Sequence, residues 1–356
     1  MPDTYQPSEK RYQQSEAWFR NCGRTGLKLP AIALGCWHNF GEAGTDAAKH
    51  NDEASMHANA QAMLFAAFDH GITHFDLANN YGPAPGSAET RVGRILKEDF
   101  RGYRDELIIS TKAGYRMWPG PYGEWGSRKD LLASLDQSLQ RLQLDYVDLY
   151  YSHRPDKPVE EGGTPLEETL GALDHAVRTG KALYTGISSY SAARTLEVMR
   201  ICERDGLIKP IIHQTSYSML NRGIEPELLP VCHEVGLGTI AFCPLAQGLL
   251  TDKYLQGVPE DSRAASSAGA LQRGGVKPEV ITRVRQLNDI AQQRGQSLAQ
   301  MALSWVLRDQ GAGRGAVTTA LIGASRPSQI TENVVAAEKT AFSTEELASI
   351  DAALAG

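Results

Sequence analysis

The sequence predicts a (β/α)8 TIM barrel, and three observations support that prediction. First, apolar runs typical of strands alternate with helical patterns along the 356 residues. Second, several of these runs are almost continuously apolar, as expected for parallel strands covered on both faces. Third, the first run is followed by HNFGEAG, which lacks the G-x-G-x-x-G turn of a doubly wound dinucleotide fold. About eight strand–helix units in series favour a closed barrel over an open sheet.

The elements follow one another with short polar or glycine-containing turns. The expected strands cover residues 31–37, 72–76, 106–112, 146–153, 182–188, 210–214, 238–242 and 319–323. The expected helices lie near residues 56–70, 88–98, 128–142, 165–179, 190–205, 225–236 and 278–308, with two short helices in 327–354. Residues 18–30 contain turn residues between short β-runs, which predicts a hairpin closing the bottom of the barrel.

We expect residues 1–356 to form one domain, with residues 1–17 as a flexible N-terminal extension. Three irregular segments, 38–55, 114–126 and 255–277, each follow a β-run. Loops in these positions lie on the barrel face that carries active sites. We further expect the Gly/Ser-rich segment 255–277 to fold over a bound cofactor.

Composition excludes several classes of protein. The net charge of −6 is spread along the chain and no basic stripe occurs, which argues against a nucleic-acid partner. No apolar run approaches the roughly 20 residues needed to cross a bilayer. The polar N-terminus is not a secretory signal. Five scattered cysteines without a C-x-x-C pair are typical of a reducing compartment, so we predict a cytoplasmic protein.

Functional side chains gather at the ends of the expected strands, which a barrel brings to one face. The runs end in Asp76, Lys112, His153, Ser188, Gln214 and Phe242. Any single polar strand end is equally well explained by contact with solvent. The set as a whole instead indicates a cavity lined by an acid, a cation, an imidazole, an amide and an aromatic ring.

Asp76, Tyr81, Lys112 and His153 form a chemically coherent group. A lysine ammonium near a tyrosine favours the phenolate and lowers the tyrosine pKa, and a carboxylate keeps that lysine charged. We therefore expect Tyr81 to serve as a proton donor, with His153 holding a substrate oxygen. The alternatives are a packed loop aromatic for Tyr81 and a structural ion pair for Asp76 and Lys112.

Six segments resemble the signature segments of the aldo-keto reductase family, in that family's order and across residues 31–342. They are HFDLANNYG, IISTKAG, YYSHRPD, GISSYS, AFCPLAQGLLTDKY and LIGASRPSQITEN. The resemblance implies a catalytic tetrad of Asp76, Tyr81, Lys112 and His153. It also implies hydride transfer from a reduced nicotinamide to an aldehyde or ketone, with Tyr81 giving the proton and no metal taking part.

The resemblance also implies a cofactor site. Phe242 is expected to stack on the nicotinamide, while Ser188 and Gln214 bond its carboxamide. Ser325, Arg326 and Gln329 near a helix N-terminus would suit a 2′-phosphate, which favours NADPH over NADH. The alternative for Arg326 is an ordinary solvated charge. The remaining expected cofactor residues are Trp37 (beside the substrate pocket), Asp76, Cys243, Pro244, Leu245, Gln247, Gly248, Lys253, Arg263, Gly323, Glu332 and Asn333.

Within the family, NNYGPAPGSAE, PGPYGEWGSRKDLL and HQTSYSMLNR are most similar to bacterial reductases of L-glyceraldehyde 3-phosphate. This similarity implies NADPH-dependent reduction of that aldehyde or of methylglyoxal, in a homo-oligomer such as a tetramer. Arg116, Arg128 and Arg154 are candidate phosphate ligands, and Trp118, Tyr122 and Trp125 could rim the pocket or pack within the loop. Potassium-channel β subunits are the next most similar group, so the alternative is a cofactor-binding regulatory subunit.

The sequence gives less support to two other kinds of chemistry. A sugar-phosphate isomerase on the same fold would need a carboxylate base and no nicotinamide site. A catalytic metal is not predicted from the nine histidines. His70 and His74 are four apart, but Gly71 and the following strand prevent a helical ligand pair, and His38, His50 and His57 lack ligand spacing.

Overall fold

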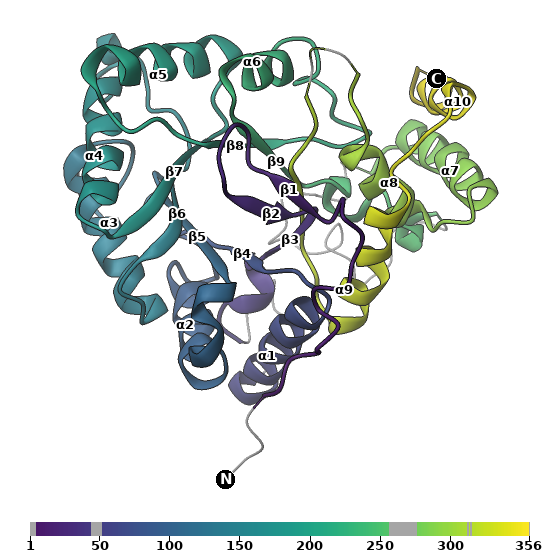
Figure 1. Ribbon diagram of the computed structural model, residues 1–356, viewed down its shortest axis with the longest axis horizontal. Helices are drawn as coiled ribbons and strands as arrows, with labels where there is room; N and C mark the ends of the chain where they lie inside the picture. Colours follow the sequence, from purple (N-terminus) through teal and green to yellow (C-terminus); the bar gives the residue numbers. More distant parts are fainter. Residues whose placement is uncertain (1–4, 44–51, 256–275, 312, 314, 356) are drawn as a thin grey trace.

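A closed barrel of eight parallel strands forms the centre of the computed structural model, which describes residues 5–43, 52–255, 276–311, 313 and 315–355 (Figure 1). The strands pair in chain order, and the last closes the barrel by pairing with both the first and the seventh. They are β3 (Ile32–Gly35), β4 (His74–Asp76), β5 (Ile108–Ala113), β6 (Val147–Ser152), β7 (Ala182–Ser188), β8 (Ile212–Ser216), β9 (Gly238–Phe242) and β10 (Thr319–Ile322). The predicted barrel is confirmed.

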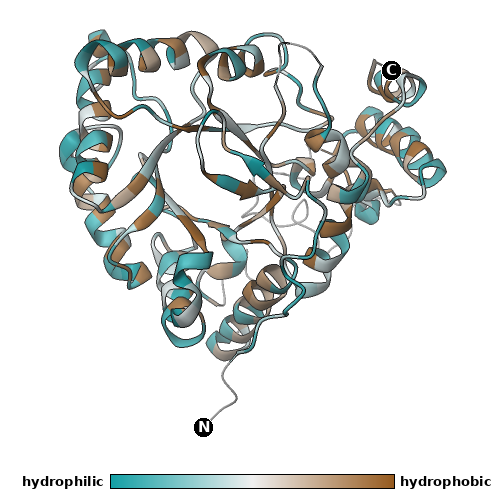
Figure 2. Cartoon of the chain, viewed as in Figure 1, coloured by the Kyte–Doolittle hydropathy of each residue, from teal (hydrophilic) through white to brown (hydrophobic). Residues whose placement is uncertain are grey.

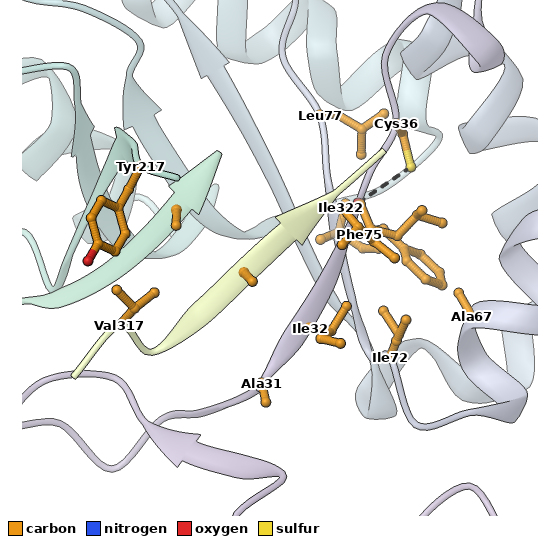
Figure 3. Packing of buried hydrophobic residues seen from close by; sticks show 14 of the residues in the cluster. Ala31, Ile32, Cys36, Ala67, Ile72, Phe75, Leu77, Tyr217, Val317 and Ile322 are labelled. Carbon is orange, nitrogen blue, oxygen red and sulfur yellow. Dashed lines mark hydrogen bonds between the residues drawn. The ribbon is translucent and has the colours of Figure 1, made fainter. Parts of the chain in front are cut away.

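Helices surround the barrel, with their hydrophilic surfaces turned outward (Figure 2). They are α1 (Glu53–Asp69), α2 (Ser87–Asp99), α3 (Arg128–Leu142), α4 (Leu166–Arg178), α5 (Ala192–Asp205), α6 (Leu228–Val235), α7 (Pro278–Gln293), α8 (Leu298–Leu307), α9 (Pro327–Val334) and α10 (Thr344–Ala355). Apolar side chains fill the space between strands and helices; Figure 3 shows Ile32, Ile72 and Phe75 beside Ala67 of α1.

The single helix expected over 278–308 is wrong, because the chain breaks there into α7 and α8. Gly295 adopts a left-handed φ of 68°. The Ser297 hydroxyl then accepts a hydrogen bond from the Gln300 backbone N–H, and the Gln300 side chain accepts one from the Ser297 N–H. This reciprocal capping box starts a new helix.

The predicted hairpin is confirmed as β1 (Phe19–Asn21) and β2 (Lys28–Pro30), which lies across one mouth of the barrel in Figure 1. Cys22 and Leu29 are fully buried against a cluster from the barrel interior that includes Ile212 and Ile240. Gly23 is required here, because a Cβ at its φ of 55° would lie 2.1 Å from a backbone oxygen of the α6–β9 turn. The hairpin thereby covers the amino ends of the strands.

Residues 5–17 precede this hairpin, and part of this segment packs on α1. The Tyr5 ring stacks on Phe65 at 3.8 Å, and its hydroxyl donates to Asp69 Oδ1 at 2.8 Å. That residues 1–17 form a flexible extension stays a prediction, as does the assignment of residues 1–356 to one domain.

The barrel interior changes from apolar to polar along its axis. Above the apolar cluster lie inward-facing side chains near the carboxyl ends of the strands. Their buried members are His74, Asp76, Ser110, Lys112, Ser188 and Gln214. Because side chains alternate between the two faces of a strand, residues two apart on β4 and on β5 share this interior. The polar layer sits at the end of the barrel opposite the hairpin.

Candidate active site

An ion pair between Asp76 and Lys112 lies at the centre of the polar layer. Lys112 Nζ is 2.6 Å from Asp76 Oδ2 and also donates to the Leu77 carbonyl at 2.6 Å. Both charged side chains are 0 % exposed. Asp76 Oδ1 accepts two further hydrogen bonds, from Ser110 Oγ at 2.7 Å and from Gln214 Nε2 at 3.1 Å. The buried carboxylate is therefore surrounded by donors, as a buried charge requires.

Tyr81 and His153 lie beside this ion pair. Tyr81 comes from the turn after β4, and its ring centroid is 5.1 Å from Lys112 Nζ. His153 directly follows β6, and its ring centroid is 5.7 Å from that of Tyr81. The structure thus brings together all four residues of the predicted tetrad. Their catalytic roles stay predictions.

The electrostatics of Tyr81 differ from the expectation. Burial raises the pKa of the phenol well above its ordinary value, and the Asp76 charge raises it further. The expected lowering by Lys112 is wrong, because the Lys112 ammonium is matched by Asp76 at 2.6 Å. Burial also lowers the pKa of Lys112, and Asp76 opposes that shift. Tyr81 therefore keeps its proton at neutral pH and is suited to donate it to an oxygen that gains negative charge.

His153 is a neutral imidazole. Burial lowers its pKa well below the ordinary value, and the positive charges of Lys112 and Arg154 lower it further. The ring of Tyr115 packs edge-on against it, with centroids 4.6 Å apart. Its Nδ1 is buried without a hydrogen-bond partner among the described residues. A neutral ring can still donate one hydrogen bond, which is what binding a carbonyl oxygen needs.

Trp37 completes one wall of the site. It follows β3, is 41 % exposed, and its ring centroid lies 5.7 Å from that of Tyr81. Phe242, at the end of β9, lines a neighbouring cavity of about 430 Å³ together with Ser189, Thr215 and Ser216. Aromatic rings therefore flank the polar centre on more than one side.

The expected nicotinamide residues occupy adjacent strand ends. Ser188 of β7 is in register with Gln214 of β8, and Ser216 of β8 is in register with Phe242 of β9. Because the Gln214 amide nitrogen donates to Asp76, its carbonyl oxygen is left to accept from another group. This donor and acceptor set fits a carboxamide lying beside the ring of Phe242.

The segment after β9 has an unusual backbone. Cys243, Ala246 and Gln247 all have positive φ values, of 53°, 47° and 59°. Non-glycine residues in this region are uncommon and concentrate at ligand sites. Pro244, Leu245, Gln247 and Gly248 form this turn, with Lys253 in the next one. Arg263 and residues 256–275 lie outside the described residues, so the predicted closure of 255–277 stays untested.

A third group lies at the start of α9, after β10. Gln329 Oε1 accepts hydrogen bonds from the Ser325 N–H at 2.8 Å and from the Ser325 hydroxyl at 3.2 Å. Arg326 donates to Ser328 at 2.8 Å. Glu332 and Asn333 follow on the same helix, and Gly323 precedes it. Ser325, Arg326 and Gln329 are thus gathered at one helix N-terminus, where N–H groups favour an anion.

Two asparagines that the sequence analysis did not select support this group. Asn39 donates to the Ala324 carbonyl at 2.6 Å, and Asn59 of α1 donates to the Ser325 carbonyl at 3.1 Å. Both partners are more than 250 residues away in sequence, so no local pattern could identify them. Ser110 was also missed, although its position two residues before Lys112 places it on the same face of β5.

The three candidate phosphate ligands differ in their surroundings. Arg128 turns away to the Gly171 carbonyl at 3.1 Å. Arg154 pairs with Glu124 at 2.7 Å, between the rings of Tyr115 and Trp125. Arg116 is exposed and has no partner among the described residues. Trp125 packs on Arg154 within the loop, whereas Tyr122 is 56 % exposed.

No group of three or more histidine, cysteine, aspartate or glutamate side chains among the described residues could hold a metal ion. No helix in the described part of the chain has the length and apolar character needed to cross a membrane.

The closed parallel barrel, with a buried Asp–Lys pair, a phenol and an imidazole gathered at its carboxyl end, has the form of a barrel enzyme with its site on that face. The aldo/keto reductase family matches residues 31–355, and the chain belongs to that family and is an oxidoreductase.

Several curated relatives cover nearly the whole chain. L-glyceraldehyde 3-phosphate reductases of Escherichia coli K12 and O157:H7 are each 54 % identical over 352 residues, 96 % of this chain and 93 % of theirs. A putative voltage-gated potassium channel subunit beta of Schizosaccharomyces pombe is 37 % identical over 337 residues, 92 % of this chain and 90 % of its own.

Proposed function

We propose that this protein reduces L-glyceraldehyde 3-phosphate with NADPH, using Tyr81 as the general acid. The observation that carries the proposal is the buried Asp76–Lys112 pair beneath Tyr81 and His153. The 54 % identity to reductases of that aldehyde supports the choice of substrate. Methylglyoxal is a second candidate substrate, since it is also a small aldehyde.

When bound in this site, a reduced nicotinamide would supply the hydride. The chain's own residues bind and polarise the carbonyl: the Tyr81 phenol and the neutral His153 ring donate hydrogen bonds to its oxygen. As that oxygen gains negative charge it takes the Tyr81 proton, and the phenolate left behind lies beside the Lys112 ammonium. Because burial and Asp76 hold the pKa of Tyr81 high, the phenol gives up its proton only to a strongly basic oxygen, the alkoxide formed as the hydride is received, and solvent later returns a proton to Tyr81.

Recognition of the cofactor and of the substrate phosphate would involve two separate cations. Arg326, with Ser325 and Gln329, is gathered where a 2′-phosphate could accept hydrogen bonds, which supports NADPH over NADH. At the substrate side, Arg116 is the exposed cation nearest in sequence to Tyr115, which packs on His153. We propose Arg116 as the phosphate ligand, because Arg154 is held by Glu124.

The test measures NADPH oxidation with L- and D-glyceraldehyde 3-phosphate and methylglyoxal. Tyr81→Phe removes the transferable proton and keeps the ring, so kcat should fall about 10²–10⁴-fold. Undiminished turnover would contradict the assigned role.

Two other results would change the function itself. Tight NADPH binding without turnover of any aldehyde would favour a regulatory subunit, and no NADPH binding would favour an isomerase. A homo-oligomer and a cytoplasmic location stay predictions, the first testable by light scattering.

A further inference from the structure

Two buried side chains continue the hydrogen-bond network beneath Asp76. His74 lies two residues before Asp76 on β4, and Ser110 lies two residues before Lys112 on β5. The strands are in register so that Asp76 faces Ser110. Ser110 Oγ is 2.7 Å from Asp76 Oδ1 and 2.9 Å from His74 Nε2. Both His74 and Ser110 are 0 % exposed.

The chemistry of these groups fixes the direction of each hydrogen bond. Asp76, as the ion-pair partner of Lys112, only accepts, so the Ser110 hydroxyl must donate to it. That hydroxyl has one hydrogen, so Ser110 Oγ must accept from His74, which then carries its proton on Nε2. In agreement, His74 Nδ1 is buried without a hydrogen-bond partner among the described residues. The order is His74 Nε2–H to Ser110 O–H to Asp76 Oδ1.

This order has a geometric consequence for Asp76. Its Oδ1 receives the shorter bond from Ser110 and the longer one, 3.1 Å, from Gln214. Because the Ser110 hydroxyl fixes Oδ1, the other carboxylate oxygen, Oδ2, faces Lys112 Nζ. Without the hydroxyl, Gln214 would be the remaining donor to Oδ1, and the carboxylate would be free to rotate toward it. Both Lys112 and Gln214 would then move from the positions proposed for catalysis and for the carboxamide.

We propose that Ser110 is a positioning residue of this reductase: its hydroxyl, oriented by the Nε2–H form of His74, holds Asp76 and thereby Lys112 and Gln214. The inference rests on the proposed function for its kinetic consequence, but the proton order is a property of the chain alone.

The kinetic test compares two neighbours on β5. Ser110→Ala removes the inward hydroxyl, and Thr111→Ala removes an outward hydroxyl that bonds Glu89 of α2 at 2.5 Å. Ser110→Ala should lower kcat about 10–100-fold, the size expected when catalytic groups are misplaced, and change the shape of the pH profile of kcat. Thr111→Ala should keep the wild-type kcat and profile, and Ser110→Thr, which retains a hydroxyl, should recover activity.

The second test needs no cofactor and no activity. Nitrogen-15 NMR of the histidine rings in the wild-type chain should show His74 as the neutral Nε2–H tautomer at pH 7. In Ser110→Ala, the His74 Nε2 signal should shift because its acceptor is lost.

The outcomes separate the two proposals. A wild-type protein inactive on every aldehyde contradicts the proposed function, while the tautomer measurement still tests Ser110. An active wild type with an unchanged Ser110→Ala variant, equal losses in Ser110→Ala and Thr111→Ala, or an Nδ1–H tautomer of His74 would each overturn the positioning role.

Discussion

Lys112 carries an ammonium group to the centre of the barrel, where Asp76 is its only carboxylate partner among the described residues. Removing one partner of a buried pair leaves an uncompensated charge, which typically costs about 3–5 kcal/mol. Lys112→Met should lower the free energy of unfolding by about that amount in urea titrations at pH 7. Adding Asp76→Asn should recover part of the loss.

A surface pair provides the matched control for this prediction. Lys181 Nζ lies 2.6 Å from Asp136 Oδ1, but the two side chains are 43 % and 51 % exposed. Lys181→Met should cost less than about 1 kcal/mol, since water already solvates both charges. Equal losses at Lys112 and Lys181 would show that burial does not determine the contribution of the Asp76–Lys112 pair.

Single residues also show how far sequence reasoning reaches. The positions of Asp76, Lys112, His153 and Gln214 were predictable, because each closes an apolar run and parallel strands share one carboxyl end. The direction in which the Tyr81 pKa shifts was not predictable, since it depends on burial and on which group neutralises Lys112. The ion pair between Arg154 and Glu124 was also not predictable, because the side chains of loops follow no periodic sequence pattern.

At the scale of elements, the eight strands were predictable from apolar runs, but their lengths were not. The run 72–76 contributes only His74–Asp76 to β4. Ile72 precedes the strand and packs in the cluster outside the barrel (Figure 3). The break between α7 and α8 was missed because α8 is apolar on nearly all sides, so the helical pattern of α7 runs on into it without interruption. The Ser297–Gln300 capping signal was the better guide.

That capping box gives a prediction about α8. Ser297→Ala removes the acceptor of the Gln300 N–H and should lower the free energy of unfolding by about 1 kcal/mol, within the range of N-cap substitutions. Ser349→Ala on α10 is the control, because the Ser349 hydroxyl donates to the Glu345 carbonyl inside a helix and not to a group at a helix end. Thermal or urea unfolding at pH 7 measures both. An Ser297→Ala protein as stable as the control would rule out a role for the cap.

At the scale of the whole molecule, buried neutral histidines link stability to pH. Burial lowers the pKa of His74 and of His213 from the ordinary 6.5 to about 4. The unfolded chain therefore binds protons on these rings at a higher pH than the folded chain does. Stability from this source is complete above pH 6.5 and is lost as the pH falls toward 4.

His213 is suited to test this linkage because it lies outside the proposed catalytic group. Its protonation should remove about 1–2 kcal/mol of unfolding free energy between pH 7 and pH 5. His213→Gln should reduce the difference between urea titrations at these two pH values by that amount. His175→Gln on α4 serves as the control, and a His213→Gln difference identical to wild type would contradict the assignment.

The hairpin ahead of the barrel has a consequence for biosynthesis. Cys22 Sγ contacts the Ile211 carbonyl at 3.4 Å, and Arg20 reaches the Val317 carbonyl at 3.0 Å, 297 positions along the chain. The hairpin can therefore complete its contacts only after the segment that contains Val317 has been synthesised. Closure of the barrel thus depends on contacts between segments that are far apart in sequence, and such contacts slow folding.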